Sequence, residues 1–513
     1  MSNRDVESAW SYHSSTKHSF SSIRTDPRPL DWANKPLLFK LYPTLEPLVL
    51  PRDFSQSSSA ALSAIAQTET QTERDVVPDL SRLGAVLYFS AGITKRRTYP
   101  GGEIYYRAAA CTGALYEIEL YLVCSDLPDL TAGVYHFGPG DFALRKLRSG
   151  DYRAILVRAT GADSAISHAP LTIICTGTYW RNAWKYQSRT YRHFGWDNGT
   201  ILANVLAMCA ALALPARVVL GFVDAEVNRL LNLNTHREVA FSLVPIGHTA
   251  ELPLEQPTEI EPLKLDTVSL SKTEVDYAAM RAMHESSSLQ SGAEVAEWRR
   301  HTQMRELPAI RGACTTLRSY EEGANSLDPI EEVILRRGST RTFSRASISF
   351  AQLSTMLDFA TRGIPADFLD PLGTSLNDLY LIVNAVDGLR PGAYVFHRER
   401  NELECLKEGE FRKEARCLGL DQDLPGEASV AIFFLADLRW ILDQFGNRGY
   451  RAVQLEAGIL GGKLYLAAYA QYLGATGLTF YDDDVIEFFS PHAEGKSAIF
   501  LIALGKRAQH VRR

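Results

Sequence analysis

The chain repeats one sequence pattern at a constant spacing of 259 positions, and this repeat limits the possible folds more than any other feature. Leu120-Tyr121-Leu122-Val123 returns as Leu379-Tyr380-Leu381-Ile382. The same spacing continues without a gap as far as Asp224 and Asp483. Solenoid repeats are far shorter, at about 20 to 50 residues. We therefore predict two copies of one domain within the 513 residues.

Both copies combine strand patterns with helix patterns. Short apolar runs, which are typical of buried strands, occur in pairs at the repeat spacing. They lie at 119–125 and 378–384, at 133–137 and 392–396, and at 171–177 and 430–436. Each copy also has a long stretch with apolar residues around most of a helix circumference, at 198–214 and at 456–474. Such a stretch predicts a helix buried on several sides, so the predicted fold class is α+β.

The domain boundaries follow from the repeat and from one change in composition. We assign residues 1–250 to a first domain, 251–324 to a linker and 325–513 to a second domain. Residues 251–272 contain three prolines and four glutamates, which favours an exposed connector. Residues 273–301 contain a helical pattern followed by a serine-rich break. We expect the linker to wrap around the surface and not to form a third domain.

The composition excludes several classes of protein. Apolar residues make up 46% and charged residues 22%, as in ordinary globular proteins. The net charge of −6 gives no basic footprint for nucleic acid. The most apolar stretch, 201–214, is shorter than the ~20 residues of a membrane span, and the N-terminus lacks the apolar core of a signal peptide. Seven cysteines without a CxxC spacing or a ligand cluster favour the cytoplasm and argue against a metal site.

A basic cluster opens the second copy, and another closes it. A short amphipathic pattern from Pro329 ends in Arg336-Arg337-Gly338-Ser339-Thr340-Arg341, and Lys506-Arg507 follow the last strand pattern. One arginine side chain can donate hydrogen bonds to two phosphate oxygens at once, so these clusters could hold a phosphorylated cofactor. The alternative is a solvated helix end, where basic side chains are favoured by the helix dipole.

These features resemble the FMN-dependent nitroreductase superfamily, which has a mainly antiparallel sheet flanked by helices. The first copy is similar to the SagB/ThcOx-type dehydrogenases, which include azoline oxidases. It has Tyr12-His13, Thr16-Lys17-His18-Ser19, Gly92-Ile93-Thr94 and the stretch from Arg107 to Glu119. That last stretch is similar to the family pattern R-x-x-P-S-x-G-A-L-Y-P-x-E. Cys111-Thr112 replace its Pro-Ser, and Glu117 replaces its second proline.

The resemblance implies that the two copies form a pseudo-dimer within one chain and bind FMN at their interface. One copy of the family domain binds the FMN phosphate, and the other lays a loop along the flavin ring. The expected phosphate-binding residues belong to the second copy: Arg337, Ser339, Arg341, Lys506 and Arg507. The expected ring-contacting residues belong to the first copy: Arg107, Thr112, Gly113, Ala114 and Leu115. Small residues at 113 and 114 would let the backbone approach a flat ring closely.

The reciprocal site matches the pattern poorly. We align Ser15-Thr16-Lys17 with Ser339-Thr340-Arg341, which puts Tyr12-His13 in place of the two arginines. Residues 245–248 replace the Leu-Gly-Lys-Arg ending, Ala366 falls opposite Arg107, and 371–374 fall opposite Thr112 to Leu115. We therefore expect one good FMN site and one degenerate site in each chain.

Lys185-Tyr186 match a pair that lies beside the flavin in azoline oxidases and is implicated in proton removal. Oxidation by hydride loss also requires a base for the departing proton. A lysine can supply it where burial or a nearby cation lowers its pKa. It could alternatively stabilise reduced flavin by its charge, or be a surface lysine beside a packed tyrosine. The second copy has Gln444-Phe445 at the equivalent positions, so the pair belongs to one copy.

Other polar residues are weaker candidates. Asp482, Asp483 and Asp484 could suggest a metal site, but consecutive aspartates in a loop are more often solvated. Asp224 and Asp483 are equivalent in the repeat, in a loop that passes beside the flavin in this superfamily. The sequence has no HExxH, GxGxxG or P-loop motif, so a nicotinamide cofactor would act only as a transient co-substrate.

The leading prediction is an FMN-dependent dehydrogenase that oxidises a heterocycle, such as azoline to azole in a modified peptide or a small molecule. One alternative is an NAD(P)H-dependent reductase of nitroaromatics or quinones. Another is a flavin-poor scaffold subunit of a biosynthetic complex. We expect neither nucleic acid nor membrane as a partner, and we leave further oligomerisation open.

Overall fold

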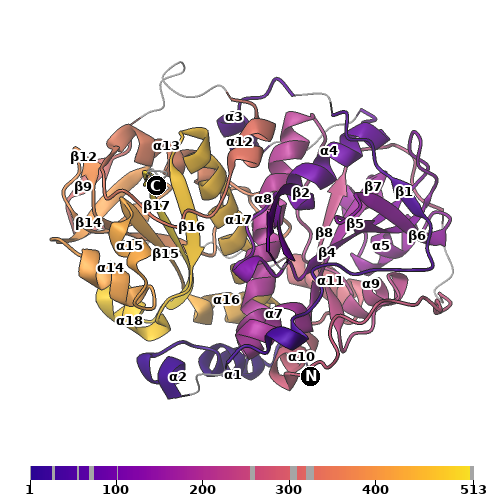
Figure 1. The fold of residues 1–513 in the computed structure, drawn as a ribbon, viewed down its shortest axis with the longest axis horizontal. Coiled ribbons are helices and arrows are strands. Elements are labelled where there is room, and N and C mark those ends of the chain that lie inside the picture. Colours follow the sequence, from indigo (N-terminus) through magenta and orange to yellow (C-terminus); the bar gives the residue numbers. More distant parts are fainter. Residues whose placement is uncertain are drawn as a thin grey trace.

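The computed structural model describes residues 2–25, 29–54, 57–68, 74–100, 102–254, 260–300, 309–318 and 328–508. It has two α+β halves side by side, with two long helices between them (Figure 1). The predicted fold class is confirmed. None of the helices in these ranges combines the length and the hydropathy that a membrane span needs.

Each half is built on one large antiparallel sheet. The first sheet has the strand order β1 (Pro47–Val49), β6 (Ala143–Ser149), β5 (Gly133–Gly138), β4 (Ile118–Cys124), β7 (Leu171–Thr178) and β8 (Glu238–Ile246). The second has the order β16 (Gly474–Leu478), β17 (Ser497–Gly505), β15 (Val430–Ala436), β11 (Asp378–Val383), β13 (Gly392–His397), β14 (Glu402–Glu408) and β9 (Cys314–Thr316). The central strands β4, β7 and β15 are buried along their whole length, which explains their continuous apolar runs.

The helices of the two halves follow one order at the repeat spacing. In the first half they are α5 (Arg153–Ala159), α6 (Ser164–Ser167), α7 (Tyr179–Tyr186), α8 (Thr190–Ala211) and α9 (Asp224–Leu230). In the second half they are α14 (Arg412–Leu418), α15 (Asp423–Glu427), α16 (Leu438–Phe445), α17 (Arg448–Ala470) and α18 (Asp482–Phe489). The helices α4 (Leu80–Ala91) and α13 (Phe350–Thr361) pack against α8 and α17 respectively.

Short elements complete the two halves. β2 (Ile93–Tyr99) pairs with β3 (Gly102–Arg107), and β10 (Ile348–Ser349) pairs in parallel with β12 (Val386–Asp387). The remaining helices are α1 (Glu7–Ser15), α2 (Phe20–Thr25), α3 (Ala61–Ala66), α10 (Ala278–Ser286), α11 (Gly292–Arg299) and α12 (Ile330–Arg336). Three 3₁₀ turns are η1 (Trp32–Asn34), η2 (Thr112–Ala114) and η3 (Gln187–Arg189).

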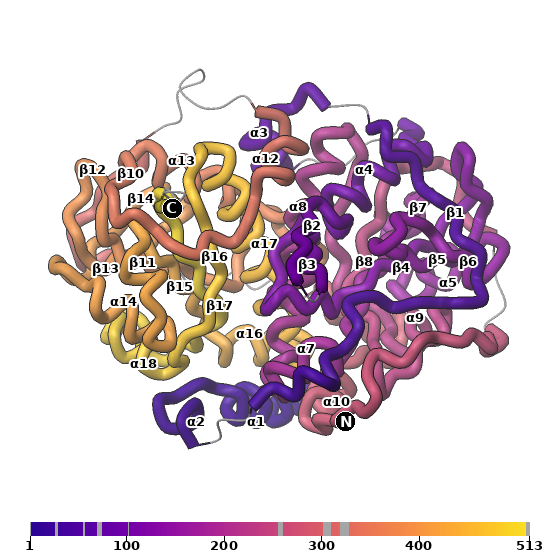
Figure 2. The backbone as a smooth tube through the Cα atoms, viewed as in Figure 1, coloured from indigo at the N-terminus to yellow at the C-terminus, as the bar shows by residue number. Residues whose placement is uncertain are grey.

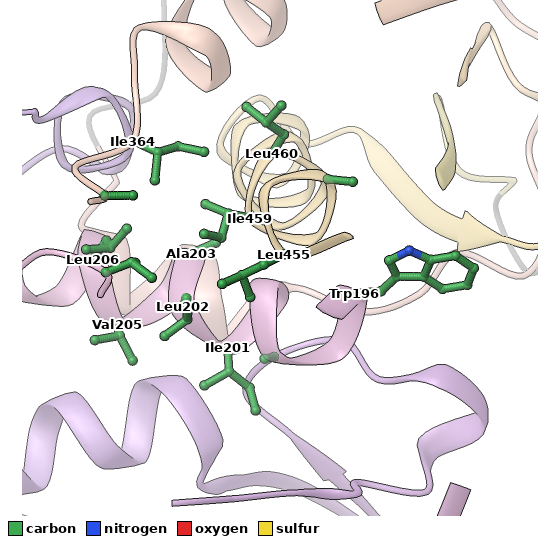
Figure 3. Packing of buried hydrophobic residues seen from close by; sticks show 14 of the residues in the cluster. Trp196, Ile201, Leu202, Ala203, Val205, Leu206, Ile364, Leu455, Ile459 and Leu460 are labelled. Carbon is green, nitrogen blue, oxygen red and sulfur yellow. The ribbon is translucent and has the colours of Figure 1, made fainter. Parts of the chain in front are cut away.

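The two central helices cross at a pair of glycines. Gly199 of α8 lies against Gly458 of α17, and a Cβ added to Gly199 would lie 2.5 Å from the Gly458 Cα. Trp196 donates a hydrogen bond of 2.6 Å from its indole to the Gln454 side chain, which ties the helices together beside the crossing. Figure 3 shows the apolar side chains of both helices, including Leu202 and Ile459, packed around this point. The crossing therefore sets how closely the two halves approach.

Both central helices begin earlier than the sequence predicted, at 190 and 448 instead of 198 and 456. Their first turns contain buried arginines, and these form ion pairs that link the halves. Arg192 donates to Asp482 at 2.7 Å, and Arg451 donates to Asp224 at 2.6 Å. Both arginines are 0% exposed. An apolar pattern could not mark helical turns whose buried side chains are charged.

The two aspartates are therefore structural. Burial alone would raise the pKa of Asp224, but Arg448 and Arg451 outweigh it and lower this pKa to about 2. Arg189 and Arg192 likewise hold the pKa of Asp482 below its usual range, against the effect of burial. The sequence paired Asp224 with Asp483, and this was wrong by one residue. Asp482 is the structural counterpart, and Asp483 forms an ion pair with Lys17 near the surface.

Part of the predicted linker belongs to the second half. β9 forms the outer strand of the second sheet, and the expected helix in 273–301 is α10. α10 lies beside α1 at one end of the molecule (Figure 2). Arg192 donates to the backbone oxygen of His13 at 2.7 Å, and Arg451 donates to that of His284 at 2.8 Å. α1 and α10 thus hold equivalent places.

This equivalence corrects one alignment from the sequence. Ser15-Thr16-Lys17 do not correspond to Ser339-Thr340-Arg341, because they belong to the end of α1 and its cap, whose counterpart is α10. The counterpart of the basic cluster instead precedes Val76, which bridges to His248 as Phe343 bridges to Arg507. Of the residues just before Val76, the structure describes Arg74 and Asp75, and residues 69–73 lie outside the described ranges.

We expect Gly199→Ala to destabilise the protein, although alanine is favoured over glycine in a helix by about 0.5 to 1 kcal/mol. The new methyl group would meet the backbone of α17, which cannot move away without separating the halves. The expected loss is about 1 to 3 kcal/mol in the free energy of unfolding, measured by chemical denaturation. Gly140→Ala is the control, because its nearest neighbour would lie at 3.7 Å. Equal stability of the two variants would contradict this role of the crossing.

Candidate functional site

The two halves meet where the loop after β3 touches the end of α12. The guanidinium of Arg337 donates from Nε to the backbone oxygen of Ala108 at 2.8 Å and from Nη2 to that of Arg107 at 3.1 Å. These contacts join the second half's basic cluster to the first half's loop at residues 107–116. The two segments singled out in the sequence are therefore neighbours in the fold.

The basic cluster surrounds two tyrosines of α17. The Ser339 hydroxyl lies 3.3 Å from that of Tyr465, and the Thr340 hydroxyl lies 3.5 Å from that of Tyr469. The Arg507 guanidinium lies over the Tyr469 ring, 5.3 Å from its centre. The end of β17 is held against the same turn, because the backbone of Ser344 donates to that of Lys506 at 2.9 Å.

Three cations of the cluster face solvent. Arg341, Lys506 and Arg507 are exposed, and none of them forms an ion pair with another residue of the described ranges. Gly338 has open space beside it, since a Cβ there would find only the Tyr469 hydroxyl, at 3.7 Å. Free cations next to an open turn and several hydroxyl groups suit a phosphate group. The residues present therefore fit the phosphate of FMN.

The first half contributes a loop with unusual backbone geometry. Gly113, Ala114 and Tyr116 have φ values of 61°, 52° and 55°, in the left-handed region. Thr112 fixes this loop to α8, because both its backbone N–H and its hydroxyl donate to Asp197 at 2.9 Å. The anchor offsets part of the strain that a non-glycine residue has in this region.

Gly113 lies directly against Tyr186. A Cβ added to Gly113 would lie 2.8 Å from the Tyr186 hydroxyl, so this position requires glycine for space as well as for its φ. α7 ends at Tyr186, because Gln187 has a φ of 50°. The end of α7 therefore brings Tyr186, and Lys185 next to it in the chain, to the loop.

Charges from both halves act on this pair. Burial, and then the Arg341 guanidinium, lower the pKa of Lys185. Burial, and then the neighbouring Asp197, raise the pKa of Tyr186. The Lys185 ammonium lies 5.0 Å from the centre of the Tyr186 ring. The residues of this junction can thus hold an anion and present an amine with an increased tendency to be neutral.

Two residues of the predicted ring-contacting set are internal. Arg107 is 4% exposed, and its guanidinium donates to the backbone oxygen of Leu38 at 2.7 Å. Leu115 is 2% exposed. Their side chains support the loop from within, whereas Gly113 is exposed on its outer side.

The equivalent place in the second half is closed by side chains. Phe445 stands where the first half has Tyr186, and it is 5% exposed. Its backbone oxygen accepts hydrogen bonds from the Trp298 indole at 3.0 Å and from Asn3 at 3.1 Å. Glu456 takes the place of Asp197 and binds the backbone of Leu376 at 2.9 Å. The loop anchor is retained there, but the lysine and the tyrosine are not.

The sequence missed three residues of this site: Asp197, Tyr465 and Tyr469. All three lie within the long central helices, where Tyr465 and Tyr469 match an apolar helix face. The one sequence signal at Asp197 is a carboxylate placed directly before the apolar stretch at 198–214. The aspartates at 482–484 contribute nothing to this site.

Comparisons with known proteins agree with this fold. Residues 334–506 match the model of the Nitroreductase family. The crystal structure titled "putative nitroreductase from Anabaena variabilis" is 26% identical and has a TM-score of 0.77. That match covers 98% of this chain and 99% of the other. The likeness therefore extends over both halves.

Two curated relatives match shorter stretches. "Putative nitroreductase MJ1384" of Methanocaldococcus jannaschii is 25% identical over 172 residues, which are 34% of this chain and 82% of the relative. "Microcin B17-processing protein McbC" of Escherichia coli is 27% identical over 144 residues, 27% of this chain and 49% of the relative. This chain therefore spans about half of McbC. Together the comparisons show a match of the second half to the Nitroreductase family model and a likeness of the whole chain to one nitroreductase structure.

We expect Arg341→Gln to raise the pKa of Lys185, because loss of a nearby cation favours the charged form of the amine. The neutral amine reacts with acylating reagents, so the pH at half-maximal labelling of Lys185, followed by mass spectrometry, should rise by about 0.5 or more. Arg345→Gln is the matched control, because Arg345 is an exposed arginine of the same segment paired with Glu427. An unchanged labelling profile in Arg341→Gln would show that the two groups are not coupled.

Proposed function

We propose that this chain is an FMN-dependent oxidoreductase with one flavin site, formed where the two halves meet. The contact of Arg337 with the backbone of Arg107 and Ala108 is the observation that supports it most directly. It joins a cluster of free cations from one half to a fixed loop of the other. The full-length likeness to a nitroreductase structure agrees with this arrangement. We also propose that the two halves arose by duplication of one domain.

Each segment has a separate role in this proposal. Ser339, Arg341, Lys506 and Arg507 would bind the phosphate, while Arg337 holds the two halves in register. Thr112, Gly113 and Ala114 would present backbone to the flavin ring, with Arg107 and Leu115 supporting them from within. When bound, FMN supplies the group that accepts or donates hydride.

Lys185 is the proposed base. A substrate that loses a hydride to form a double bond must also lose a proton, and the neutral form of an amine can accept it. Burial and Arg341 favour that neutral form. Tyr186 would position the reacting group, since its hydroxyl lies at the loop and its pKa is raised, which keeps it a hydrogen-bond donor.

The proposed reaction is dehydrogenation of a heterocycle, azoline to azole, in a modified peptide. The sequence motif around Lys185 and the likeness to a microcin B17-processing protein support this substrate class. A reductase of nitro compounds or quinones driven by NAD(P)H is the second candidate. It is favoured by the likeness to MJ1384 and to the Anabaena variabilis structure, both named as nitroreductases.

We expect the purified chain to bind one FMN, because the second location lacks the lysine and the tyrosine and is closed by Phe445. Titration followed by flavin fluorescence gives the stoichiometry. The double variant Lys506→Gln, Arg507→Gln should weaken binding at least tenfold, since each charged hydrogen bond contributes about 1.5 to 3 kcal/mol. Lys413→Gln, an exposed lysine of α14, is the control. Two FMN per chain, or equal affinity in all three proteins, would contradict the single site.

We expect Lys185→Ala to slow oxygen-dependent oxidation of an azoline peptide by about 10²-fold or more, the usual contribution of a general base. FMN content should stay near one per chain. Gln444→Ala changes the equivalent position of the second half and should leave the rate unchanged. Full activity in Lys185→Ala would remove this residue from the mechanism. Rapid NADPH oxidation with a quinone, without azoline turnover, would favour the reductase.

A further inference from the structure

A second group of polar side chains lies where the loop at residues 107–116 meets α8. Cys111, Glu117 and Asp197 each direct one ligand-type atom to a common point, and these atoms lie within 4.8 Å of one another. Cys111 lies in the loop, Glu117 follows the loop directly before β4, and Asp197 belongs to α8. Cys111 and Glu117 are also two of the positions at which the loop departs from the family pattern given above.

We propose that these three side chains bind one divalent zinc ion. The Cys111 sulfur lies 3.5 Å from Oε2 of Glu117 and 3.4 Å from Oδ2 of Asp197. Zinc bonds of about 2.3 Å to sulfur and about 2.1 Å to oxygen, at tetrahedral angles, place those ligand atoms about 3.6 Å apart. The two distances from sulfur to oxygen thus match neighbouring corners of a zinc tetrahedron, and the two oxygens lie within 4.8 Å of each other.

The burial of the group supports a bound cation. Glu117 is 0% exposed and Asp197 is 4% exposed, so both carboxylates lie away from water. Oε1 of Glu117 has no hydrogen-bond partner among the described residues. A buried carboxylate with an oxygen that lacks a donor is costly, and a cation bound at Oε2 would offset the negative charge of the whole group.

A water molecule can supply the fourth ligand. A small cavity of ≈ 10 Å³ adjoins Cys111 and Asp197, close to the volume that one water molecule needs. Arg107 also lines this cavity. Its positive charge would offset the single negative charge left when a thiolate and two carboxylates bind a divalent ion.

The ligand set selects among metals by its chemistry. A thiolate is a soft ligand that magnesium and calcium do not favour, whereas zinc binds sulfur and carboxylate oxygen equally well. Binding releases the proton of the Cys111 thiol, because the thiolate is the metal ligand. The ion would fasten the loop to α8 beside Thr112 and so fix the left-handed turn at Gly113. This effect of the zinc ion on the loop does not depend on bound flavin.

The test measures metal directly. The full chain is stripped with a chelator, dialysed and titrated with Zn²⁺, and its metal content is measured by mass spectrometry. Parallel titration with Co²⁺ reports a thiolate ligand through its charge-transfer absorption in the near ultraviolet. We expect one ion per chain and a thiolate band in the cobalt form.

Variants identify the ligands. Cys111→Ser should lower the affinity for zinc at least tenfold and abolish the thiolate band, and Glu117→Gln should lower the affinity without removing the band. Cys417→Ser is the control, because Cys417 is an exposed thiol of α14 and should leave both signals unchanged. The proposal is overturned if the unaltered chain binds neither ion. It is also overturned if cobalt binds without a thiolate band, or if Cys111→Ser binds zinc as the unaltered chain does.

Discussion

The close crossing of α8 and α17 at Gly199 and Gly458 is the constraint on which the rest of the structure depends. Two backbones can approach this closely only where neither helix has a side chain. The distance between the two helices at the crossing sets how far apart the sheets, loops and outer helices of the two halves lie. The site between the halves exists because the crossing brings residues 107–116 within hydrogen-bond reach of Arg337.

Ion pairs on either side of the crossing fix its orientation. Each half supplies an aspartate, Asp224 or Asp482, to arginines of the other half's central helix. Removing charges from water is costly, and such pairs add little net stability over apolar contacts of the same shape. Their effect is on specificity, since a shifted crossing would leave buried charges without partners. The halves are therefore held in one register by polar contacts and held together by apolar packing.

The sequence predicted the framework well because the framework follows apolar patterns. The strands at 119–125 and 430–436 and the buried central helices are continuous apolar runs, and their burial explains those runs. The starts of α8 and α17 were missed because buried arginines do not fit an apolar pattern. The equivalence of α1 with α10 was missed because insertions change the repeat spacing there. Both features depend on contacts between residues far apart in the chain, such as that of Arg192 with Asp482 and that of Arg451 with His284.

The candidate site was predictable only in part, for a related reason. Lys185, Tyr186 and the basic cluster could be found as motifs, and the fold brings them together. Asp197 could not be found as a motif, because its carboxylate accepts hydrogen bonds from three donors of Cys111 and Thr112 that reach it only after folding. Arg107 and Leu115 belong to the same motif as Gly113, yet their side chains point inward. A motif thus identifies a segment, while the direction of each side chain depends on packing.

The difference between the two halves follows from their being on one chain. In a symmetric dimer of identical chains, every substitution appears at both sites. Here Tyr186 and Phe445 stand at equivalent positions with opposite consequences. Tyr186 lies at an exposed loop glycine, while Phe445 is buried and held by Trp298 and Asn3. The closed location adds packing to the interface and thereby stabilises it. The open location keeps exposed cations, Arg341, Lys506 and Arg507, that the packing of the halves does not require.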